Sequence, residues 1–449
     1  MKRNNTTVKK LKCAILGYGD RSYWYSQYAF DRPEELEVIA VIDVNSFKLS
    51  QAKARFNLTD DALYSSLDVF LAKDIECDFV INGTMDNIHY ETTIKLLEKR
   101  YNVLLEKPVT GNPKELLEIE ALAIKNDCKV VVCHVLRYTP FFKRVKQIID
   151  SGEIGEIMNI EMYEHVWHGH FVNAYVRGKW RNEEECGSGF LLAKCCHDTD
   201  LMCWLNNTTK PTQVASFGKR AFYCPENAPE GSTDYCYNCP KKDECMFDAS
   251  KFEAVMDCCP QYTWAGMDRD CRNIPMADKL EFLKTSEFGK CVYKTTMNIV
   301  DRQSVVVNFA NGSTATLNMV GGASKAGRFM HIVCQYGEIY GYLEDNKFVY
   351  RKFNKDRVNV KYCGDEFMYS DHVIDINLDD MREQNASAGH SGGDFHIMKD
   401  LTALIRGEGA SVSTTVISDS VNSHLICYAA EKSRTENVIV DLEKEYGKR

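Results

Sequence analysis

The sequence predicts two architectures in one chain: a doubly wound parallel α/β sheet, followed by an α+β domain with a large, open, mostly antiparallel sheet. Up to about residue 134, short β-branched runs alternate with helical patterns, which is typical of βαβ units. After about residue 285, strand-like stretches dominate, and one of them carries the hairpin signal Asn311-Gly312. We therefore expect a first domain at 1–134 and a second at 135–449, with a cysteine-rich insertion at about 222–275.

The composition excludes several classes of protein. The chain has 449 residues, 44% of them hydrophobic, which suits two domains with cores of their own. The sequence contains no run of about 20 apolar residues, so no membrane span is expected. The basic start MKRNNTTVKK lacks the apolar core of a signal peptide. We therefore expect a cytoplasmic protein. The net charge is -9 without a Lys/Arg block, so nucleic acid is not an expected partner.

The first strand runs into a glycine turn. In LKCAILGYGDRS, Gly17 and Gly19 are the first two members of a G-x-G-x-x-G pattern whose third position is Ser22. Gly17 permits a tight turn, Gly19 lets the backbone approach a pyrophosphate, and a small Ser22 still allows close helix packing. The segment predicts the phosphate-binding turn of a Rossmann domain, although G-x-G alone is weak evidence.

The next strand, LEVIAVIDVN, ends in Asp43, 24 positions after Gly19. A carboxylate there accepts hydrogen bonds from the ribose hydroxyls of NAD and repels a 2′-phosphate, so NAD is favoured over NADP. An ordinary glycine turn and a surface aspartate remain the alternative interpretation.

A strand, turn, helix and strand follow, and the last strand ends in Glu106-Lys107-Pro108. Ligands of doubly wound sheets lie beyond the carboxyl ends of the strands. We therefore expect the Gly83-Thr84 turn and Lys107 to face the same crevice.

The chain resembles the glucose-fructose oxidoreductase / inositol dehydrogenase / rhizopine catabolism (Gfo/Idh/MocA) family over nearly its whole length. The matching segments are GYGDRS, Asp43, NGTMDNIHYE, the E-K-P at 106–108, HVLRYTPFF and FLLAKCCHDTDLMCWL. The resemblance implies an NAD-dependent enzyme that oxidises or reduces a sugar or polyol carbon, with Lys107 beside the nicotinamide and a homodimer or homotetramer as the assembly. It also implies cofactor contacts from Gly17, Tyr18, Gly19, Asp20, Arg21, Ser22, Asp43, Thr84, Asn87, His89, Glu106 and Lys107, and substrate contacts from Arg137 and Tyr138.

The segment 187–205 is a predicted helix with Lys194, His197 and Asp200 near one face. By the resemblance, His197 contacts the substrate hydroxyl and takes its proton, a role that suits an imidazole, and Asp200 contributes to substrate binding. Many relatives have an aspartate where this chain has Ala193, which suggests that Lys194 shares the acid/base or substrate-orienting role. In the alternative interpretation, Lys194 and Asp200 pair on the helix surface, or His197 is a core residue.

EHVWHGHF at 164–171 holds His165, His168 and His170. If the segment is a strand, His168 and His170 share a face and His165 points away. We expect His168 and His170 to line a substrate wall, and a structural role or a metal site are the alternatives.

AGHSGGD at 388–394 is a glycine-rich turn before a predicted helix. Asp394 is either the N-cap of that helix or part of a turn that closes over the ligand, with His390 reaching the substrate.

The insertion contains Cys224, Cys236, Cys239 and Cys245 with gaps of 11, 2 and 5 residues. A C-x-x-C pair flanked by two thiols in a stretch with little apolar material suits a structural zinc site. An iron-sulfur cluster and free thiols are the alternatives, and Cys258, Cys259 or Cys271 are substitutes for Cys224.

The sequence therefore favours an NAD-dependent oxidoreductase acting on a small-molecule sugar, polyol or derivative. Two hypotheses compete with it: a glycoside hydrolase that oxidises its substrate transiently and regenerates NAD, and a cofactor-binding sensor without turnover. Lys107 and His197 argue against the sensor, because a binding module needs neither.

Overall fold

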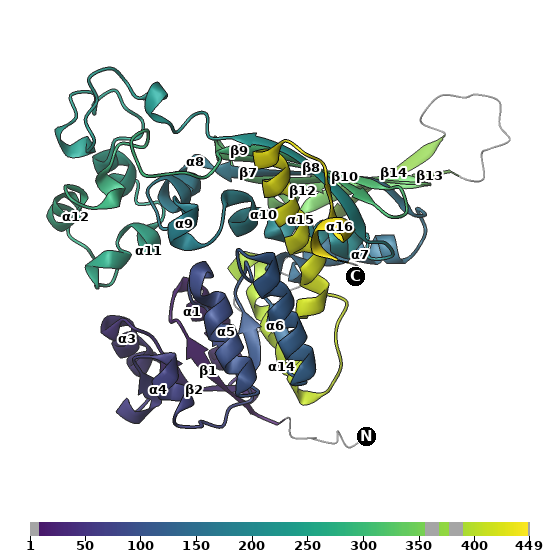
Figure 1. The fold of residues 1–449 in the computed structure, drawn as a ribbon, viewed down its shortest axis with the longest axis horizontal. Coiled ribbons are helices and arrows are strands. Elements are labelled where there is room, and N and C mark those ends of the chain that lie inside the picture. The colour runs from purple at the N-terminus through teal and green to yellow at the C-terminus, as the bar shows by residue number, and fades with distance from the viewer. Residues whose placement is uncertain (1–8, 355–367, 377–388, 448–449) are drawn as a thin grey trace. The chain divides into compact units, whose positions relative to one another are not determined.

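The computed structural model describes residues 9–354, 368–376 and 389–447. Contacts divide the chain into two compact units, Met1–Asp150 with Ile376–His424 and Ser151–Asp375 with Leu425–Arg449 (Figure 1). The segment 376–424 thus belongs to the same unit as the N-terminal residues. Within the described part of the chain, no helix combines the length and apolar character needed to cross a bilayer.

The first unit contains a six-stranded parallel sheet in the order β3-β2-β1-β4-β5-β6. This is the strand order of a Rossmann fold, in which sequence order reverses between β1 and β4 and the ligand crevice lies at that reversal. The predicted doubly wound sheet is confirmed. The strands are Leu11–Leu16 (β1), Leu36–Ile42 (β2), Leu63–Tyr64 (β3), Phe79–Asn82 (β4), Asn102–Leu105 (β5) and Val130–Val132 (β6).

The C-terminal segment completes the core of the first unit. Phe395 and Leu401 of α14 (Gly393–Arg406) pack in the same buried cluster as Leu11 and Ile15 of β1. Burying each such side chain contributes about 1.5–3 kcal/mol, so the unit depends on a segment far away in sequence. Its other helices are Asp20–Ser26 (α1), Tyr28–Asp31 (α2), Ser46–Phe56 (α3), Leu67–Leu71 (α4), His89–Glu98 (α5), Pro113–Lys125 (α6) and Pro140–Asp150 (α7).

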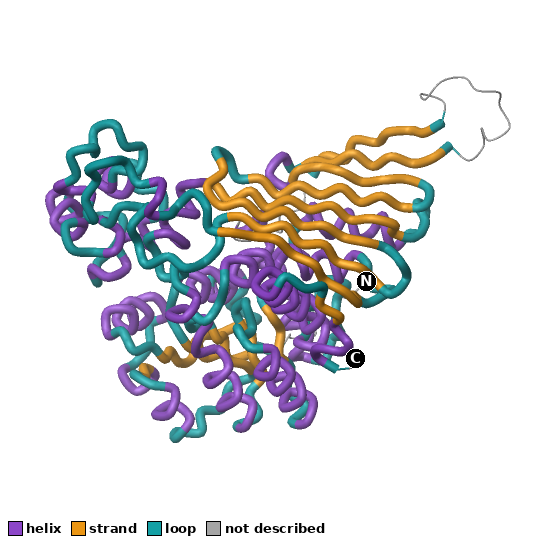
Figure 2. Tube along the Cα trace, turned by 45° about the horizontal axis from the view of Figure 1, so that its top comes forward, coloured by secondary structure: helices purple, strands orange, loops and turns teal. Residues whose placement is uncertain are grey.

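The second unit contains a nine-stranded sheet in the order β14-β13-β12-β11-β7-β10-β9-β8-β15, counted over the described residues (Figure 2). Its pairs are antiparallel except β10 with β7. Asn311-Gly312 joins β9 to β10, as the hairpin signal predicts, and Gly312 has φ +85. The strands are Ile157–Trp167 (β7), Pro211–Lys219 (β8), Arg302–Phe309 (β9), Thr314–Ala323 (β10), Gly327–Cys334 (β11), Gly337–Tyr342 (β12), Lys347–Phe353 (β13), Tyr369–Asp375 (β14) and Val440–Asp441 (β15).

Helix α10 (Phe190–Leu205) packs against β7 and β10. Most of its residues are buried, so it is a core helix. α15 (Ile417–Glu436) runs from the first unit into the second. The other helices of the second unit are His168–Phe171 (α8), Glu183–Cys186 (α9), Pro260–Thr263 (α11), Met276–Leu283 (α12) and Leu442–Tyr446 (α16).

The cysteine-rich insertion has a small core of its own. Trp264 is fully buried and packs with Ala254, Ile274 and Leu283. The insertion is also fastened by a buried ion pair, in which Arg177 donates to Glu253 at 2.8 Å. Apart from Cys236, the buried side chains of this core come from residues 249–283, outside the cysteine loop at 224–245 for which little apolar material was expected.

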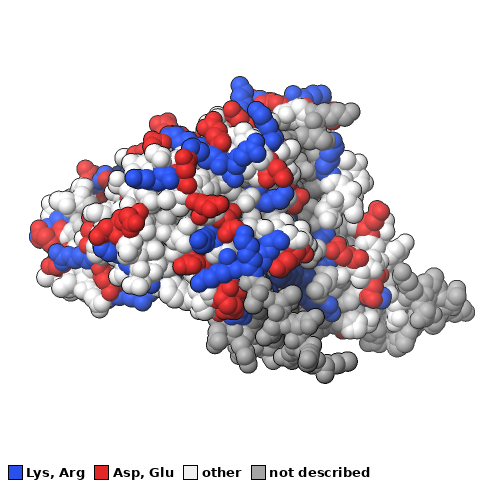
Figure 3. Space-filling view, turned by 90° about the horizontal axis from the view of Figure 1, so that it is seen from below, with Lys and Arg blue, Asp and Glu red and all other residues white. Residues whose placement is uncertain are grey.

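Lys and Arg side chains lie among Asp and Glu side chains over the face shown in Figure 3, although small basic groups occur. Interspersed positive and negative charges agree with a chain of 55 basic and 64 acidic residues. They keep the local electrostatic potential low.

Candidate active site

The carboxyl ends of four neighbouring strands bring together the predicted cofactor residues of the first unit. Gly17 follows β1, Asp43 follows β2, Gly83 follows β4 and Glu106 follows β5. The Gly83-Thr84 turn and the Glu106-Lys107 segment thus lie at the same edge of the sheet, and the prediction that they face one ligand crevice stays a prediction.

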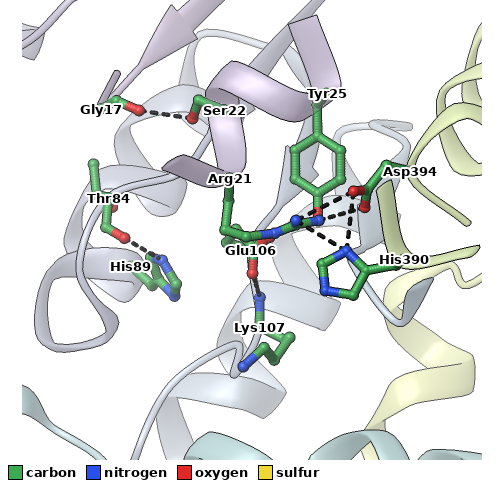
Figure 4. Close-up of polar contacts among 10 residues, drawn as sticks. All are labelled: Gly17, Arg21, Ser22, Tyr25, Thr84, His89, Glu106, Lys107, His390 and Asp394. Carbon is green, nitrogen blue, oxygen red and sulfur yellow. Dashed lines mark hydrogen bonds and ion pairs between the residues drawn. The ribbon is translucent and has the colours of Figure 1, made fainter. Parts of the chain in front are cut away.

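The glycine turn requires glycine for two reasons. Gly17 has φ +79, and a Cβ on it would lie 2.9 Å from the carbonyl oxygen of Gly83. Ser22 at the third position is buried, and its Oγ donates to the Gly17 carbonyl at 2.7 Å (Figure 4). Serine therefore replaces the third glycine and ties the turn to α1.

Asp43 holds the glycine turn against the end of β2. Its carboxylate accepts hydrogen bonds from the backbone N–H of Tyr18 at 2.8 Å and of Asn45 at 2.8 Å. Each oxygen keeps lone pairs for a second donor, so the geometry is compatible with ribose binding.

Glu106 of the E-K-P segment lies in a charged network that the sequence did not reveal (Figure 4). One carboxylate oxygen accepts from the Arg21 guanidinium at 3.1 Å and from the Tyr25 hydroxyl at 2.5 Å, and the other accepts from the Lys107 backbone N–H at 3.0 Å. Arg21 also donates to both oxygens of Asp394, at 3.3 and 2.5 Å. Glu106 and Asp394 thereby fix Arg21 next to the glycine turn.

Asp394 is an ion-pair partner and not a helix cap. The N-cap of α14 is Gly392, and no side chain caps that end. Burial alone would raise the pKa of Asp394, but Arg21 and His390 outweigh it and hold the pKa well below its usual range. His390, at φ 47, contacts the same carboxylate at 3.0 Å. The N-cap interpretation is wrong, and a substrate contact by His390 stays a prediction.

The remaining predicted cofactor residues occupy different environments. Lys107 is half-buried, and the Lys107-Pro108 peptide bond is cis. His89 is buried and its two ring nitrogens face the carbonyl oxygens of Pro108 and Thr84, at 2.8 and 3.2 Å. His89 therefore links the turns that follow β4 and β5. Gly19 and Thr84 are half-buried, and Asp20 and Asn87 are exposed.

Arg137 and Tyr138, predicted to contact substrate, are buried in the first unit. The Tyr138 hydroxyl donates to Asp400 at 3.0 Å, and Arg137 donates to the Thr414 carbonyl at 3.4 Å. These contacts fasten α14 and the segment that follows it, so both side chains have a structural role, and their substrate contact stays a prediction.

In the second unit, Lys194 and His197 are half-buried residues one turn apart on α10, between fully buried neighbours. Lys194 forms an ion pair with Glu164 of β7 at 3.5 Å, and Asp200 is fully buried. The interpretation of a surface pair between Lys194 and Asp200 is therefore wrong. Lys194 and His197 lie near one face of α10, as the helical spacing predicts, whereas Asp200 is fully buried and its substrate contact stays a prediction.

The histidines at 165–170 do not share one strand. β7 ends at Trp167, and His168 and His170 lie in the short helix α8. The chain turns tightly here, because a Cβ on Gly169 would lie 2.3 Å from the Trp167 ring. His170 packs near Tyr175 and Tyr262, with ring centroids 6.0 Å apart in both pairs. The strand interpretation is wrong for His168 and His170, and their substrate role stays a prediction.

The predicted metal site is not formed. Among residues 9–354, 368–376 and 389–447, no group of three or more His, Cys, Asp or Glu side chains is arranged to hold a metal ion. Cys236, Cys239 and Cys245 line one small cavity with Cys291, whereas Cys224 is not among its lining residues. The Arg177 guanidinium donates to the Cys236 thiol at 3.5 Å, and a cation there opposes binding of a second cation.

The thiols of this cavity are expected to differ in reactivity. Burial alone would raise the pKa of Cys239, but backbone hydrogen bonds from Thr233 and Lys241 lower it, whereas burial raises the pKa of Cys236 and Cys291. Since the thiolate is the reactive form, iodoacetamide at neutral pH should modify Cys239 faster than Cys236 or Cys291. Peptide mass spectrometry of a labelling time course measures this, with Cys239→Ser as the control. Faster labelling of Cys236 or Cys291 would contradict it.

Two family models match the chain. The oxidoreductase family model with the NAD-binding Rossmann fold matches residues 11–134, and the Gfo/Idh/MocA C-terminal domain model matches residues 142–237. The chain belongs to the Gfo/Idh/MocA family of oxidoreductases. The predicted resemblance is confirmed, and the Rossmann sheet described above is the NAD-binding fold of that family.

Relatives of this Gfo/Idh/MocA chain are distant. YteT of Bacillus subtilis (strain 168), named as an oxidoreductase, is 21% identical over 81% of this chain and 82% of its own length. Inositol 2-dehydrogenase of Salmonella paratyphi B is 23% identical over 47% of this chain and 59% of its own length.

Solved structures share the fold. The NAD-binding oxidoreductase of Klebsiella pneumoniae has a TM-score of 0.68 at 16% identity, covering 97% of this chain and 99% of that one. The WlbA dehydrogenase of Bordetella pertussis, solved with NADH and UDP-GlcNAcA, has a TM-score of 0.64 at 14% identity, covering 97% and 98%.

Proposed function

We propose that this protein is an NAD-dependent oxidoreductase that transfers hydride between a nicotinamide cofactor and a hydroxyl-bearing carbon of a sugar, polyol or derivative. The observation that carries the proposal is the set of turns at the carboxyl ends of β1, β2, β4 and β5 in a chain of this family. Relatives support the substrate class, since one is an inositol dehydrogenase and one was solved with NADH and UDP-GlcNAcA.

The residues of the first unit fit a dinucleotide. Gly17 has no Cβ, and a Cβ there would clash with the carbonyl oxygen of Gly83. A pyrophosphate can therefore approach the backbone of this turn closely. Asp43 is placed to accept hydrogen bonds from the adenosine ribose, and its negative charge disfavours the 2′-phosphate of NADP. We assign Lys107 to the nicotinamide side of the crevice, because it lies two residues after the end of β5.

The residues of the second unit supply proton transfer. The cofactor, when bound, accepts or donates the hydride. His197 takes the hydroxyl proton as the carbon is oxidised and returns it on reduction, and Lys194 orients the oxygen. Both side chains are half-buried on one face of α10, where a substrate oxygen can reach them.

Incubation with NAD and a panel of sugars, polyols and aryl glycosides tests the proposal, with NADH absorbance and aglycone release followed together. Substrate-dependent accumulation of NADH is expected, and His197→Asn should lower its rate by about 10²–10⁴-fold, the usual contribution of a general base. Aglycone release without net NADH would favour the hydrolase instead. A protein that binds NAD but turns over no member of the panel would contradict both.

A further inference from the structure

Lys194 is the half-buried end of a row of four alternating charges in the second unit. Its ammonium pairs with Glu164 at 3.5 Å, and Glu164 pairs with Arg328 at 2.7 Å. Arg328 in turn donates to both carboxylate oxygens of Asp198, at 2.6 and 3.1 Å.

Three regular elements fix the row. Glu164 of β7 and Arg328 of β11 are direct cross-strand neighbours, so their side chains leave the same face of the sheet. Lys194 and Asp198 lie four positions apart on α10, on the same side of the helix. The helix thus contributes both ends of the row and the sheet contributes its middle.

The row is buried except at one end. Asp198 is fully buried, and Glu164 and Arg328 are 5% and 8% exposed, whereas the Lys194 side chain keeps 23% of its surface. Burial alone would lower the pKa of Arg328, but Asp198 and Glu164 outweigh it and raise the pKa. The two carboxylates balance the two cations, which a buried group of charges requires.

Stability alone does not explain the row. When charged side chains are buried, the free energy of hydration that they lose is barely offset by their mutual attraction. Apolar side chains of similar volume would stabilise the core at least as much. The contact between Glu164 and Arg328 is an ion pair without hydrogen-bond alignment, since Oε2 of Glu164 lacks a hydrogen-bond donor among the described atoms. The row brings the four charges close together but leaves Oε2 of Glu164 without a hydrogen-bond donor among the described atoms. This indicates that the row positions a side chain.

We propose that Glu164 and Arg328 are positioning residues that hold the Lys194 ammonium beside His197, and that Lys194 acts as a hydrogen-bond donor to a substrate oxygen and not as the base. The inference rests on the proposed function and gives Lys194 and His197 of α10 different roles in it. Beside the Glu164 carboxylate, an ammonium at Lys194 can stabilise negative charge developing on the oxygen of an alcohol or carbonyl. His197 remains the group that accepts the proton.

The first test removes the charge of Glu164. In Glu164→Gln we expect kcat to fall by about 10²–10³-fold, comparable to loss of one oriented donor, while the affinity for NAD is unchanged. Lys194→Met should lose as much, and Lys194→Arg should keep part of the activity because it keeps the cation. Adding Lys194→Met to Glu164→Gln should cost nothing further, since both act through one interaction.

Glu161→Gln is the matched control, because Glu161 lies on the same strand with its side chain on the opposite face. Its kcat should equal that of the wild type. If Glu164→Gln folds poorly by circular dichroism, Arg328→Lys takes its place, since it keeps the charge but loses the forked contact with Asp198 and Glu164.

The second test does not depend on turnover. Crystal structures of the wild type and Glu164→Gln should show the Lys194 ammonium displaced in the variant, while its backbone stays in place. An unmoved ammonium, or kinetic effects of the two substitutions that multiply, would overturn the inference. A wild type without turnover would refute the proposed function alone, because the displacement of Lys194 would still decide the positioning role.

Discussion

Replacing Lys107 with Met should abolish most turnover and leave NAD binding nearly intact. We expect kcat to fall by about 10²–10⁴-fold, the range for a charged side chain that acts at the reacting centre. Lys107 lies two residues after β5, and its backbone N–H donates to the Glu106 carboxylate at 3.0 Å. The carboxylate that orients this turn remains in the variant, so the turn should keep its shape. Steady-state kinetics and calorimetric titration with NAD measure the two quantities.

Lys114→Met is the matched control for Lys107→Met. Lys114 is an exposed lysine near the start of α6 in the same unit, and its replacement should change neither kcat nor the affinity for NAD. If Lys107→Met turned over substrate at the rate of this control, Lys107 would have no part in the reaction. If it lost NAD binding instead, its role would lie in holding the cofactor.

Replacing Asp394 with Asn should destabilise the first unit by about 3 kcal/mol at neutral pH. Removing one partner of a buried ion pair costs about 3–5 kcal/mol, and the lower end applies because the Arg21 side chain is 25% exposed. Guanidinium unfolding of wild type and variant measures the difference. The double variant Arg21→Met/Asp394→Asn should lose less than the sum of the single changes, since both remove one contact.

The destabilisation should depend on pH with a definite sign. The pKa of Asp394 is depressed in the folded chain, so the stability it contributes is present above the unfolded pKa of about 3.9. That contribution is lost as the pH falls through the folded pKa, and the two proteins should converge only in strong acid. Asp371→Asn, which removes the more exposed pair with Arg351, should have a much smaller effect. Equal losses from both substitutions would contradict the assignment.

The features predicted correctly from sequence are local in the chain. A β-branched run followed by Gly17 and Gly19, a strand ending in Asp43, and E-K-P after a strand each lie within a dozen residues. Their structures are set by backbone preference and by the position of each residue relative to the end of a strand. Lys194 and His197 are likewise three residues apart, so helical periodicity alone places them together.

The features missed join residues that are far apart in the chain. Arg21 meets Asp394, and Asp198 meets Arg328, at separations of 373 and 130 residues. In both cases no Asp or Glu lies three or four positions from the arginine in the sequence. A buried arginine needs an acceptor, but only the fold identifies which one.

The cysteine-rich insertion shows the same limit. The C-x-x-C spacing identified Cys236, Cys239 and Cys245, which do line one cavity, but the fourth lining thiol is Cys291 and not Cys224. The guanidinium of Arg177 beside Cys236 and the core around Trp264 come from packing. Spacing alone therefore suggested a metal where the described residues form none.

The sequence by itself determined the fold class, the family, the glycine turn and the positions of Lys107 after β5 and of Lys194 and His197 on α10, because each depends on neighbours within one or two elements. Only the tertiary structure decided which charges are paired, that 376–424 completes the first unit, and that the row ending in Lys194 is buried. The physical reason is that a charge is stabilised by whatever lies within a few ångströms in space. For distant segments, that proximity is created by packing of the core.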